Sequence, residues 1–379
     1  MSKIILILMI KNEAKILERC IGAISDFVDG FCITDTGSTD DTVSIIPDIM
    51  KGVDKPWKLY TTIFKNFGHT RTESFTNTRE FLVELGWDLQ TTYGLLLDAD
   101  MVLRVSENFD RNMIEDLDAY QIIQTQGCYD YQNIRFIKMS LTWKCIGSTH
   151  EFWRAQDSKT LGILTSKKLW IDDISDGGCK SDKYTRDERL LLEDLEEAKK
   201  TDNEEAISRN YFYLGQTYMC LGDFKKAIEY YKKRVDMGGW SQEAWFATYK
   251  IGYCYSRLED FDSTIEWCKK AWSSCNTKSE PICFIAEVLV IQEKYEEAME
   301  WVEKGINIEK DPRDILFSNN DVYKFGFYLQ KFIIMTKIPE TSQTELLCTS
   351  RELLARLPPT HSMVPVVEFV IKDLESKCV

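Results

Sequence analysis

Apolar residues in the first hundred positions gather in short runs that alternate with amphipathic stretches. The run Ile4–Ile10 predicts a buried strand, and the apolar spacing over residues 16–24 predicts a helix after it. The run Phe31–Ile33 begins a second strand and helix unit. A third unit starts with a strand at residues 57–63 and continues, after a polar stretch, into a helix that ends near Leu85. Strands that alternate with helices in this way predict a three-layer α/β domain.

The fourth apolar run, Gly94–Leu97, leads into two acids, Asp98 and Asp100, before apolar residues resume at Met101–Leu103. We expect this stretch to be a strand that is buried on both faces. In an extended chain the two carboxylates point the same way, because positions i and i+2 share a side. Paired hard oxygen ligands at the carboxyl end of a buried strand suit a divalent cation that holds a phosphate. The plainer alternative is a strand that ends in solvated acids.

The loop after the second strand also has an informative composition. Asp35 follows the strand, Gly37 permits a tight backbone, and Ser38 and Asp40 are natural caps for a helix that begins near Thr42. Such a loop places ligand-binding groups outside the strand ends of an α/β sheet. A well-capped helix with no ligand is the alternative interpretation.

The sequence between residues 105 and 180 is aromatic and strand-like. Residues 120–124, 134–141 and 169–171 predict strands. His150 and Glu151 lie between two tryptophans and could transfer a proton, or they could brace a loop.

Acids, glycines and lysines follow the last of these strands. Asp172, Asp173 and Asp176 precede a glycine pair, after which come Lys180 and Lys183. This composition predicts either a mobile loop that closes over an anion or a solvated linker.

The pattern changes to helical repeats beyond residue 186. Gly215 and Gly252, each with a tyrosine three residues later, recur at close to the ~34-residue period of tetratricopeptide repeats, and Ala286 begins a third unit. We expect most of the tryptophans in this part to be repeat core. The irregular sequence 312–379 predicts a helical cap.

Composition narrows the possible partners and the compartment. A net charge of −14 argues against nucleic acid and against an anionic membrane surface. The twelve cysteines form no Cys-x-x-Cys pairs, which indicates reduced thiols. The apolar run at the N-terminus is too short to span a bilayer, which takes about 20 residues. We therefore expect a soluble, cytoplasmic protein with no membrane span; its oligomeric state is open, and a homodimer is compatible with the sequence.

Four motifs taken together carry a resemblance to a known family. They are Met9–Glu13, Asp35–Asp40, Arg71 and Leu97–Asp100. In this order and spacing they resemble the family 2 glycosyltransferases of the GT-A fold. With the repeats, the chain resembles the cytosolic subgroup in which tetratricopeptide repeats follow the catalytic domain. The resemblance extends to about residue 310.

The resemblance implies a metal site that contains Mn²⁺ or Mg²⁺. By position, Asp100 would ligate the metal, and Asp98 would contact the ribose or share the ion. Many GT-A enzymes complete the metal shell with a histidine near the position where this chain has Asp172, Asp173 and Asp176. Of these three acids we select Asp173, since a carboxylate is an equally suitable hard ligand.

The resemblance also implies a nucleotide pocket. Asn12 and Glu13 would line it, and Asp35 would bind the base or ribose. Arg71, together with Lys180 and Lys183, would balance the diphosphate charge. The chain departs from the family at Thr36, where many members have a second acid.

These expectations combine into one predicted organisation. A GT-A catalytic domain (residues 1–185) precedes tetratricopeptide-like repeats (186–311) and a helical cap (312–379). The predicted activity is inverting transfer of a sugar from a nucleotide donor, a UDP-sugar by resemblance, to a soluble glycan, peptide or protein that the repeats could hold. Glu151 is the first candidate for the general base and His150 the second. The alternatives are an inactive, nucleotide-binding repeat scaffold and, with less support, a nucleotidyltransferase.

Overall fold

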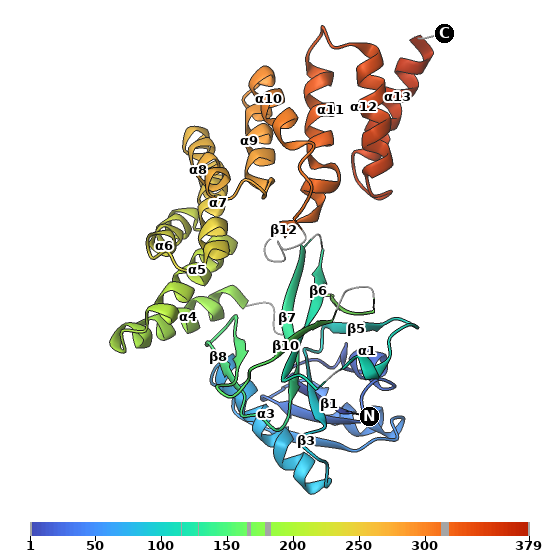
Figure 1. The fold of residues 1–379 in the computed structure, drawn as a ribbon, viewed down its shortest axis with the longest axis vertical. Helices are drawn as coiled ribbons and strands as arrows, with labels where there is room; N and C mark the ends of the chain where they lie inside the picture. Colours follow the sequence, from blue (N-terminus) through green and yellow to red (C-terminus); the bar gives the residue numbers. More distant parts are fainter. Residues whose placement is uncertain are drawn as a thin grey trace. The chain divides into compact units, whose positions relative to one another are not determined.

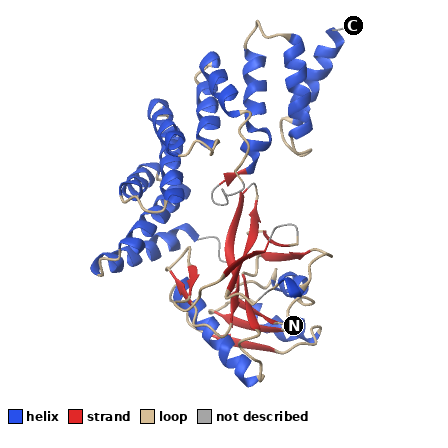
Figure 2. Cartoon of the chain, viewed as in Figure 1, coloured by secondary structure: helices blue, strands red, loops and turns tan. Residues whose placement is uncertain are grey.

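The computed structural model describes residues 2–114, 116–127, 129–164, 168–178, 183–311 and 318–377. The chain divides into two compact units, residues 1–213 and 214–379. Helices make up most of the chain after residue 183 (Figure 1, Figure 2).

The first unit contains a mixed sheet. Its elements are β1 (Lys3–Ile10), α1 (Leu17–Ile24), β2 (Gly30–Asp35), α2 (Thr42–Lys51), β3 (Trp57–Thr61), α3 (Phe67–Glu84), β4 (Thr92–Leu97), β5 (Met101–Val105), a 3-10 turn (Arg111–Met113), β6 (Ala119–Gln126), β7 (Tyr129–Lys138), β8 (Lys144–Ile146), β9 (Phe152–Arg154), β10 (Leu161–Leu164), β11 (Leu169–Asp173) and α4 (Lys183–Lys200). The strand order is β3-β2-β1-β4-β7-β6-β11-β5, with β10 beside β6, and β8 pairs with β9 separately.

The parallel part of the sheet agrees with the alternating sequence pattern. β1 runs parallel to β2 and β4, and β2 runs parallel to β3. β7 then enters antiparallel between β4 and β6. The carboxyl ends of β1, β2 and β4 therefore share one edge, where loops of an α/β sheet commonly bind ligands.

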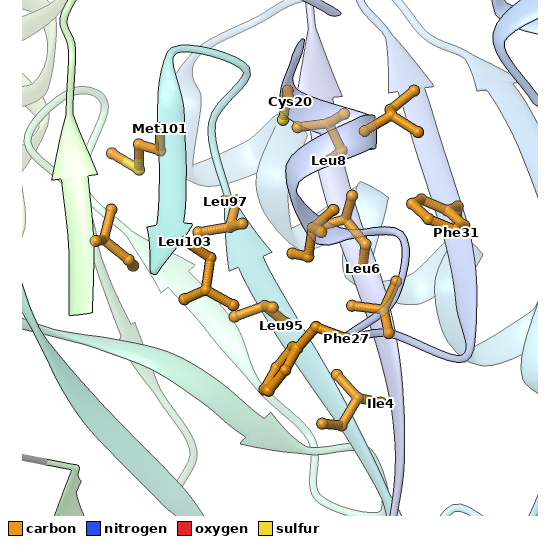
Figure 3. Close-up of a cluster of buried hydrophobic side chains, with 14 of the residues drawn as sticks. Ile4, Leu6, Leu8, Cys20, Phe27, Phe31, Leu95, Leu97, Met101 and Leu103 are labelled. Atoms are coloured by element: carbon orange, nitrogen blue, oxygen red, sulfur yellow. The ribbon is translucent and has the colours of Figure 1, made fainter. Parts of the chain in front are cut away.

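Helices cover both faces of this parallel part. Alternate β1 residues such as Leu6 and Leu8 pack with α1 and α2 (Figure 3). The intervening residues Ile5 and Ile7 pack with side chains of α3 such as Phe75. All of β4 is buried, as the apolar run predicts.

The Asp-x-Asp segment differs from its prediction, because the strand does not continue through it. The chain turns at residues 98–100, with the Met101 amide 3.0 Å from the Asp98 carbonyl oxygen. It then enters β5, which pairs with β11 instead of extending β4. The expectation of an extended chain through both acids was wrong, so the rule that positions i and i+2 share a side does not apply to Asp98 and Asp100.

Arg71, which belongs to the motifs that carry the resemblance, lies on α3. That helix begins at Phe67, and the side chain of Asn66 caps it by accepting a hydrogen bond from the His69 amide at 2.8 Å. An Asn cap replaces one of the hydrogen bonds that the first helical turn cannot make internally.

Paired helices form the second unit. They are α5 (Glu204–Cys220), which begins in the first unit, α6 (Phe224–Asp236), α7 (Ser241–Arg257), α8 (Phe261–Ser274), α9 (Glu280–Ile291) and α10 (Tyr295–Gly305). A Cβ on Gly215 would come within 2.6 Å of the Tyr231 ring, and one on Gly252 within 2.8 Å of the Cys268 sulfur. The small residues of the predicted repeats therefore lie where paired helices touch.

The C-terminal elements pack around a smaller core. They are a short strand (Ser318–Asn319), a π-helical turn (Val322–Gly326), α11 (Phe327–Lys337), α12 (Gln343–Arg356) and α13 (Val364–Lys377). Phe332, Leu353 and Val367 are the centre of that core. Of the repeat tryptophans, Trp245 is buried as expected, whereas Trp240 is exposed.

Two further observations concern solvent and membrane. In the described ranges, every cysteine is a free thiol and most are buried. No described helix combines the length and apolar character needed to cross a bilayer.

Candidate functional site

The turn after β1 is joined to the loop after β2 by hydrogen bonds. Asn12, which has a positive φ of 57°, accepts a hydrogen bond from the Thr39 amide at 2.7 Å and donates its own amide to the Ser38 hydroxyl at 2.9 Å. The Glu13 amide donates to the Thr42 hydroxyl at 2.7 Å. Asn12 and Glu13, the predicted nucleotide-pocket residues, thus lie in a turn after β1 that hydrogen bonds hold at the predicted edge of the sheet.

Asp35 is buried and shapes its own loop. Its carboxylate accepts hydrogen bonds from the amides of Gly37 and Ser38, at 3.0 and 3.1 Å, and from the Ser38 hydroxyl at 2.5 Å. Gly37 has φ of 93°, a conformation that glycine adopts at little cost. Asp35 therefore holds the loop that would face a nucleotide, and recognition of a base by this residue stays a prediction.

Arg71 connects two acids that are distant in sequence. Its Nη2 donates to Asp98 Oδ1 at 2.5 Å, and its Nε donates to Glu151 Oε1 at 2.6 Å. The Arg71 side chain is only 14% exposed. Three residues that the sequence selected separately therefore form one chain of contacts at the end of β4.

A second arginine approaches Asp98. Arg135 Nη1 lies 4.0 Å from Asp98 Oδ2, while its Nε donates to Gln124 at 2.8 Å. Burial would raise the pKa of Asp98, but the positive charges of Arg71 and Arg135 outweigh burial and lower it. Asp98 is thus an ionised carboxylate that is held by two cations.

Asp100 faces a different group of residues. A Cβ on Gly177 would stand 3.2 Å from Asp100 Oδ2 and 3.3 Å from Glu13 Oε1. The Gly178 amide donates to Glu13 Oε2 at 2.9 Å, and a Cβ on Gly178 would overlap the Asn12 carbonyl. The glycine pair thus lets this segment lie directly over the turn after β1, with two carboxylates beside it.

The three acids considered for the metal shell each have other partners. Asp173 accepts from the Tyr131 hydroxyl at 3.0 Å, Asp172 pairs with Arg104, and Asp176 pairs with Arg19 at 2.7 Å. In the part of the chain that the structure describes, no three His, Cys, Asp or Glu side chains are grouped to hold a metal. The structure does not bring Asp98, Asp100 and Asp173 together as one protein-only ligand set.

His150 lies next to Glu151 but faces α5. Its ring stacks on Tyr213, with centroids 4.1 Å apart and planes 4° from parallel. Burial lowers the pKa of the imidazole to about 3, and the charges of Lys183 and Arg209 act in the same direction. The ring is neutral near pH 7 and is a poor proton acceptor there.

Only one of the two lysines that were predicted to balance a diphosphate charge lies in the described part of the chain. Lys183 begins α4, and its charge acts on His150. Lys180 lies outside the described residues.

Sequence reasoning missed several residues that support the site. Asp187 is buried and accepts from the Thr149 hydroxyl at 3.2 Å, and burial raises the pKa of its carboxyl. Gln124 lies on β6 and Arg135 on β7. The sequence predicted these strands but assigned neither residue to the site. A polar residue at a buried strand position is the signal that could have found Arg135 and Gln124.

Comparisons with known proteins identify the repeat. The tetratricopeptide repeat family matches residues 208–233, which reach from within α5 to within α6. No curated protein matches the chain.

Similar solved structures include three proteins. BtubC (BKLC) from P. vanneervenii is 11% identical over 52% of this chain and 84% of its own, with a TM-score of 0.39. YrrB, described as a TPR protein with an unusual peptide-binding site, is 15% identical over 50% of this chain and 83% of its own, with a TM-score of 0.35. MamA D159K mutant 1 is 12% identical over 46% of this chain and 90% of its own, with a TM-score of 0.34. At these scores the similarities carry no functional conclusion.

Proposed function

We propose that the first unit is a metal-dependent glycosyltransferase of the GT-A type. It would move a sugar from a nucleotide diphosphate donor, a UDP-sugar by resemblance, to a soluble acceptor with inversion. One observation carries the proposal: Arg71 bonds both Asp98, from the Asp-x-Asp motif, and Glu151, the first candidate for the base. Both acids thereby lie at the strand edge where an α/β sheet commonly binds a ligand.

The available oxygen ligands fit a metal that is shared with a substrate. Magnesium often binds through one or two carboxylates and takes its other ligands from phosphate and water. Asp100 would hold such an ion, with the Glu13 carboxylate beside it across Gly177. When bound, Mg²⁺ or Mn²⁺ would stabilise the charge on a departing nucleoside diphosphate.

Glu151 would act as the general base. Arg71 fixes Oε1, whereas Oε2 has no hydrogen bond within the described ranges. An acceptor hydroxyl would give its proton to Oε2 as its oxygen bonds to the anomeric carbon and the sugar–phosphate bond breaks. The nucleoside diphosphate leaves with the bonding electrons. His150 suits this role less well, because its pKa of about 3 makes it a weak base near neutral pH.

The test is release and transfer of sugar from a panel of nucleotide sugars, with Mn²⁺, Mg²⁺ or EDTA. We expect wild-type turnover with metal, no turnover in EDTA, and losses of about 100-fold or more in Asp100→Asn and Glu151→Gln. Asp172→Asn is the matched control, since this acid forms an exposed pair with Arg104. The proposal would be refuted if no donor released sugar with any metal, or if Glu151→Gln kept full activity.

A second candidate function is protein interaction through the repeats. On α7, the Lys250 ammonium lies 5.0–5.1 Å from the ring centroids of Phe246, Tyr249 and Tyr253. Phe284 of α9 packs against both tyrosines, and burial lowers the pKa of Lys250. Lys250 forms no salt bridge with an acid of the described residues, although the charge of Glu280 acts on it. A cation that lies among aromatic rings in this way suits an acidic peptide.

This second candidate can be tested with an array of acidic and neutral peptides. We expect binding of acidic sequences by wild type, at least about tenfold weaker binding by Lys250→Met, and unchanged binding by Lys270→Met. Lys270 is the control because it pairs with Glu266 on exposed α8 surface. Equal binding by both variants would exclude Lys250 as the contact.

A further inference from the structure

The residues on both sides of Glu151 are held by a helix that belongs to the repeats. His150 stacks on Tyr213, and its carbonyl oxygen accepts a hydrogen bond from Arg209 Nη2. Tyr213 and Arg209 lie on α5, inside the segment that matches the tetratricopeptide repeat.

The contact continues on the other side of Glu151. The Arg209 guanidinium carbon lies 4.7 Å from the centroid of the Phe152 ring and 4.8 Å from that of Tyr213. Arg209 is therefore placed between a ring from β9 and a ring from its own helix. Stacking of a planar guanidinium on aromatic faces is favourable and directional.

The backbone at His150 needs such support. Its φ is 51°, a left-handed conformation that non-glycine residues adopt only at an energetic cost. Strain of this kind persists where surrounding contacts over-determine the conformation. Here those contacts come from α5, and the strained residue immediately precedes Glu151.

Packing of a helix on a sheet domain would not by itself require this arrangement. An ordinary helix interface buries apolar side chains, whereas here a neutral imidazole, a guanidinium and a main-chain carbonyl meet. The groups that face His150 include the charges of Lys183 on α4 and Arg209 on α5. Release of the stack would expose the imidazole to water, and the turn could then relax.

We propose that Tyr213 and Arg209 are positioning residues for Glu151, so that the part of α5 that lies in the first unit completes the site there. This inference rests on the proposed transferase function. It makes the first helix of the repeat a structural part of the site, beyond any role in holding an acceptor.

The first measurement needs no substrate. The chain has three histidines, so the ring signals of ¹³C-labelled histidine can be assigned by single substitutions. We expect no titration of His150 above pH 5 in wild type. In Tyr213→Ala the midpoint should rise toward the ordinary value of about 6.5, because water would reach the imidazole, although Lys183 and Arg209 remain. Tyr213→Phe keeps the ring and should behave as wild type does.

The second measurement is steady-state transfer with the full chain. A positioning role predicts that Tyr213→Ala lowers kcat about tenfold or more, while KM for the donor changes less than about twofold. Tyr230→Ala is the matched control, because Tyr230 stacks on Tyr218 in the same repeat. If Tyr213→Ala does not fold, Arg209→Lys replaces it, with Arg257→Lys as the control over Phe224.

Two results would overturn the inference. One is a Tyr213→Ala protein with wild-type His150 titration and wild-type kcat; the other is a Tyr213→Phe protein as impaired as Tyr213→Ala. A wild-type chain that transfers no sugar would instead refute the proposed function. In that case the histidine titration, with amide exchange at residues 149–152, still decides whether α5 holds the turn.

Discussion

Gly178 lies so close to Asn12 that a Cβ on the glycine would overlap the asparagine carbonyl oxygen. Both residues belong to segments that border the carboxylates of Glu13 and Asp100. The contact is between two backbones, so no side-chain rotation can relieve a clash there.

Gly178→Ala should therefore displace the segment that covers the turn after β1. Overpacking of this kind typically costs about 1–3 kcal/mol. We expect a lower melting temperature and faster amide exchange at residues 174–178. Gly22→Ala is the control, because a Cβ on Gly22 meets nothing within 4 Å. Equal stability of both variants would contradict the close approach.

Removal of Arg71 should destabilise the first unit strongly. Breaking a buried ion pair on one side typically costs about 3–5 kcal/mol. In Arg71→Ala the Glu151 carboxylate loses its arginine, whereas Asp98 keeps Arg135 at 4.0 Å, so the cost should lie at the lower end of that range. We expect this loss of unfolding free energy in urea unfolding of Arg71→Ala. Arg71→Lys should recover little of it, because lysine lacks the planar guanidinium that donates to both Asp98 and Glu151. Arg104→Ala breaks only an exposed pair and should cost less than about 1 kcal/mol. Arg71→Ala that unfolds at the same urea concentration as Arg104→Ala would refute the buried bridge.

His150 should make stability depend on pH. Its folded pKa of about 3 lies below the unfolded value of about 6.5, so the unfolded chain binds more protons in between. The contribution of His150 to the free energy of unfolding is then fully present above pH 6.5 and decreases as the pH falls below that value. The loss should reach about 2 kcal/mol at pH 5. Denaturant unfolding at pH 7.5 and 5.0 measures it.

His150→Asn is the matched variant for this pH experiment. Asparagine tolerates a positive φ, so the turn can keep its backbone while the titrating group is removed. The difference in unfolding free energy between the two pH values should shrink by the same ~2 kcal/mol. An unchanged difference would assign the pH dependence to other groups.

The repeat packing gives a prediction with a compensating variant. Gly215→Ala should cost about 1–3 kcal/mol, because its Cβ would come within 2.6 Å of the Tyr231 ring. Adding Tyr231→Leu should recover part of that loss, although Tyr231→Leu alone is destabilising. A double-mutant cycle by thermal unfolding measures the coupling. Additive effects would show that the two residues do not touch.

The sequence predicted the elements better than the orientation of side chains. Alternating apolar runs identified β1, β2, β4 and their helices, because burial on two faces leaves a clear pattern. The same pattern does not indicate that the chain turns at Asp98. That turn depends on the pairing of β5 with β11, which is distant in sequence.

The candidate site was predictable residue by residue but not contact by contact. Motif resemblance selected Arg71, Asp98 and Glu151 but did not predict that Arg71 contacts both acids. The role of Arg71 toward a diphosphate stays a prediction. Asp35 was selected as a ligand-binding acid, while its oxygens accept hydrogen bonds from its own loop. Local spacing does not encode which polar partners meet, since those partners are brought together by the sheet.

The pairing of β1 with β4 has a consequence for how the chain folds. Ile5 pairs with Gly94, so the pairing of β1 with β4 joins residues that are about 90 positions apart in the chain. In the repeats, by contrast, each helix packs mainly on the next one along the chain. Local contacts form quickly and distant strand pairing forms slowly. We therefore expect refolding in two phases: fast formation of the repeat helices, and slower closure of the sheet that carries Asp98.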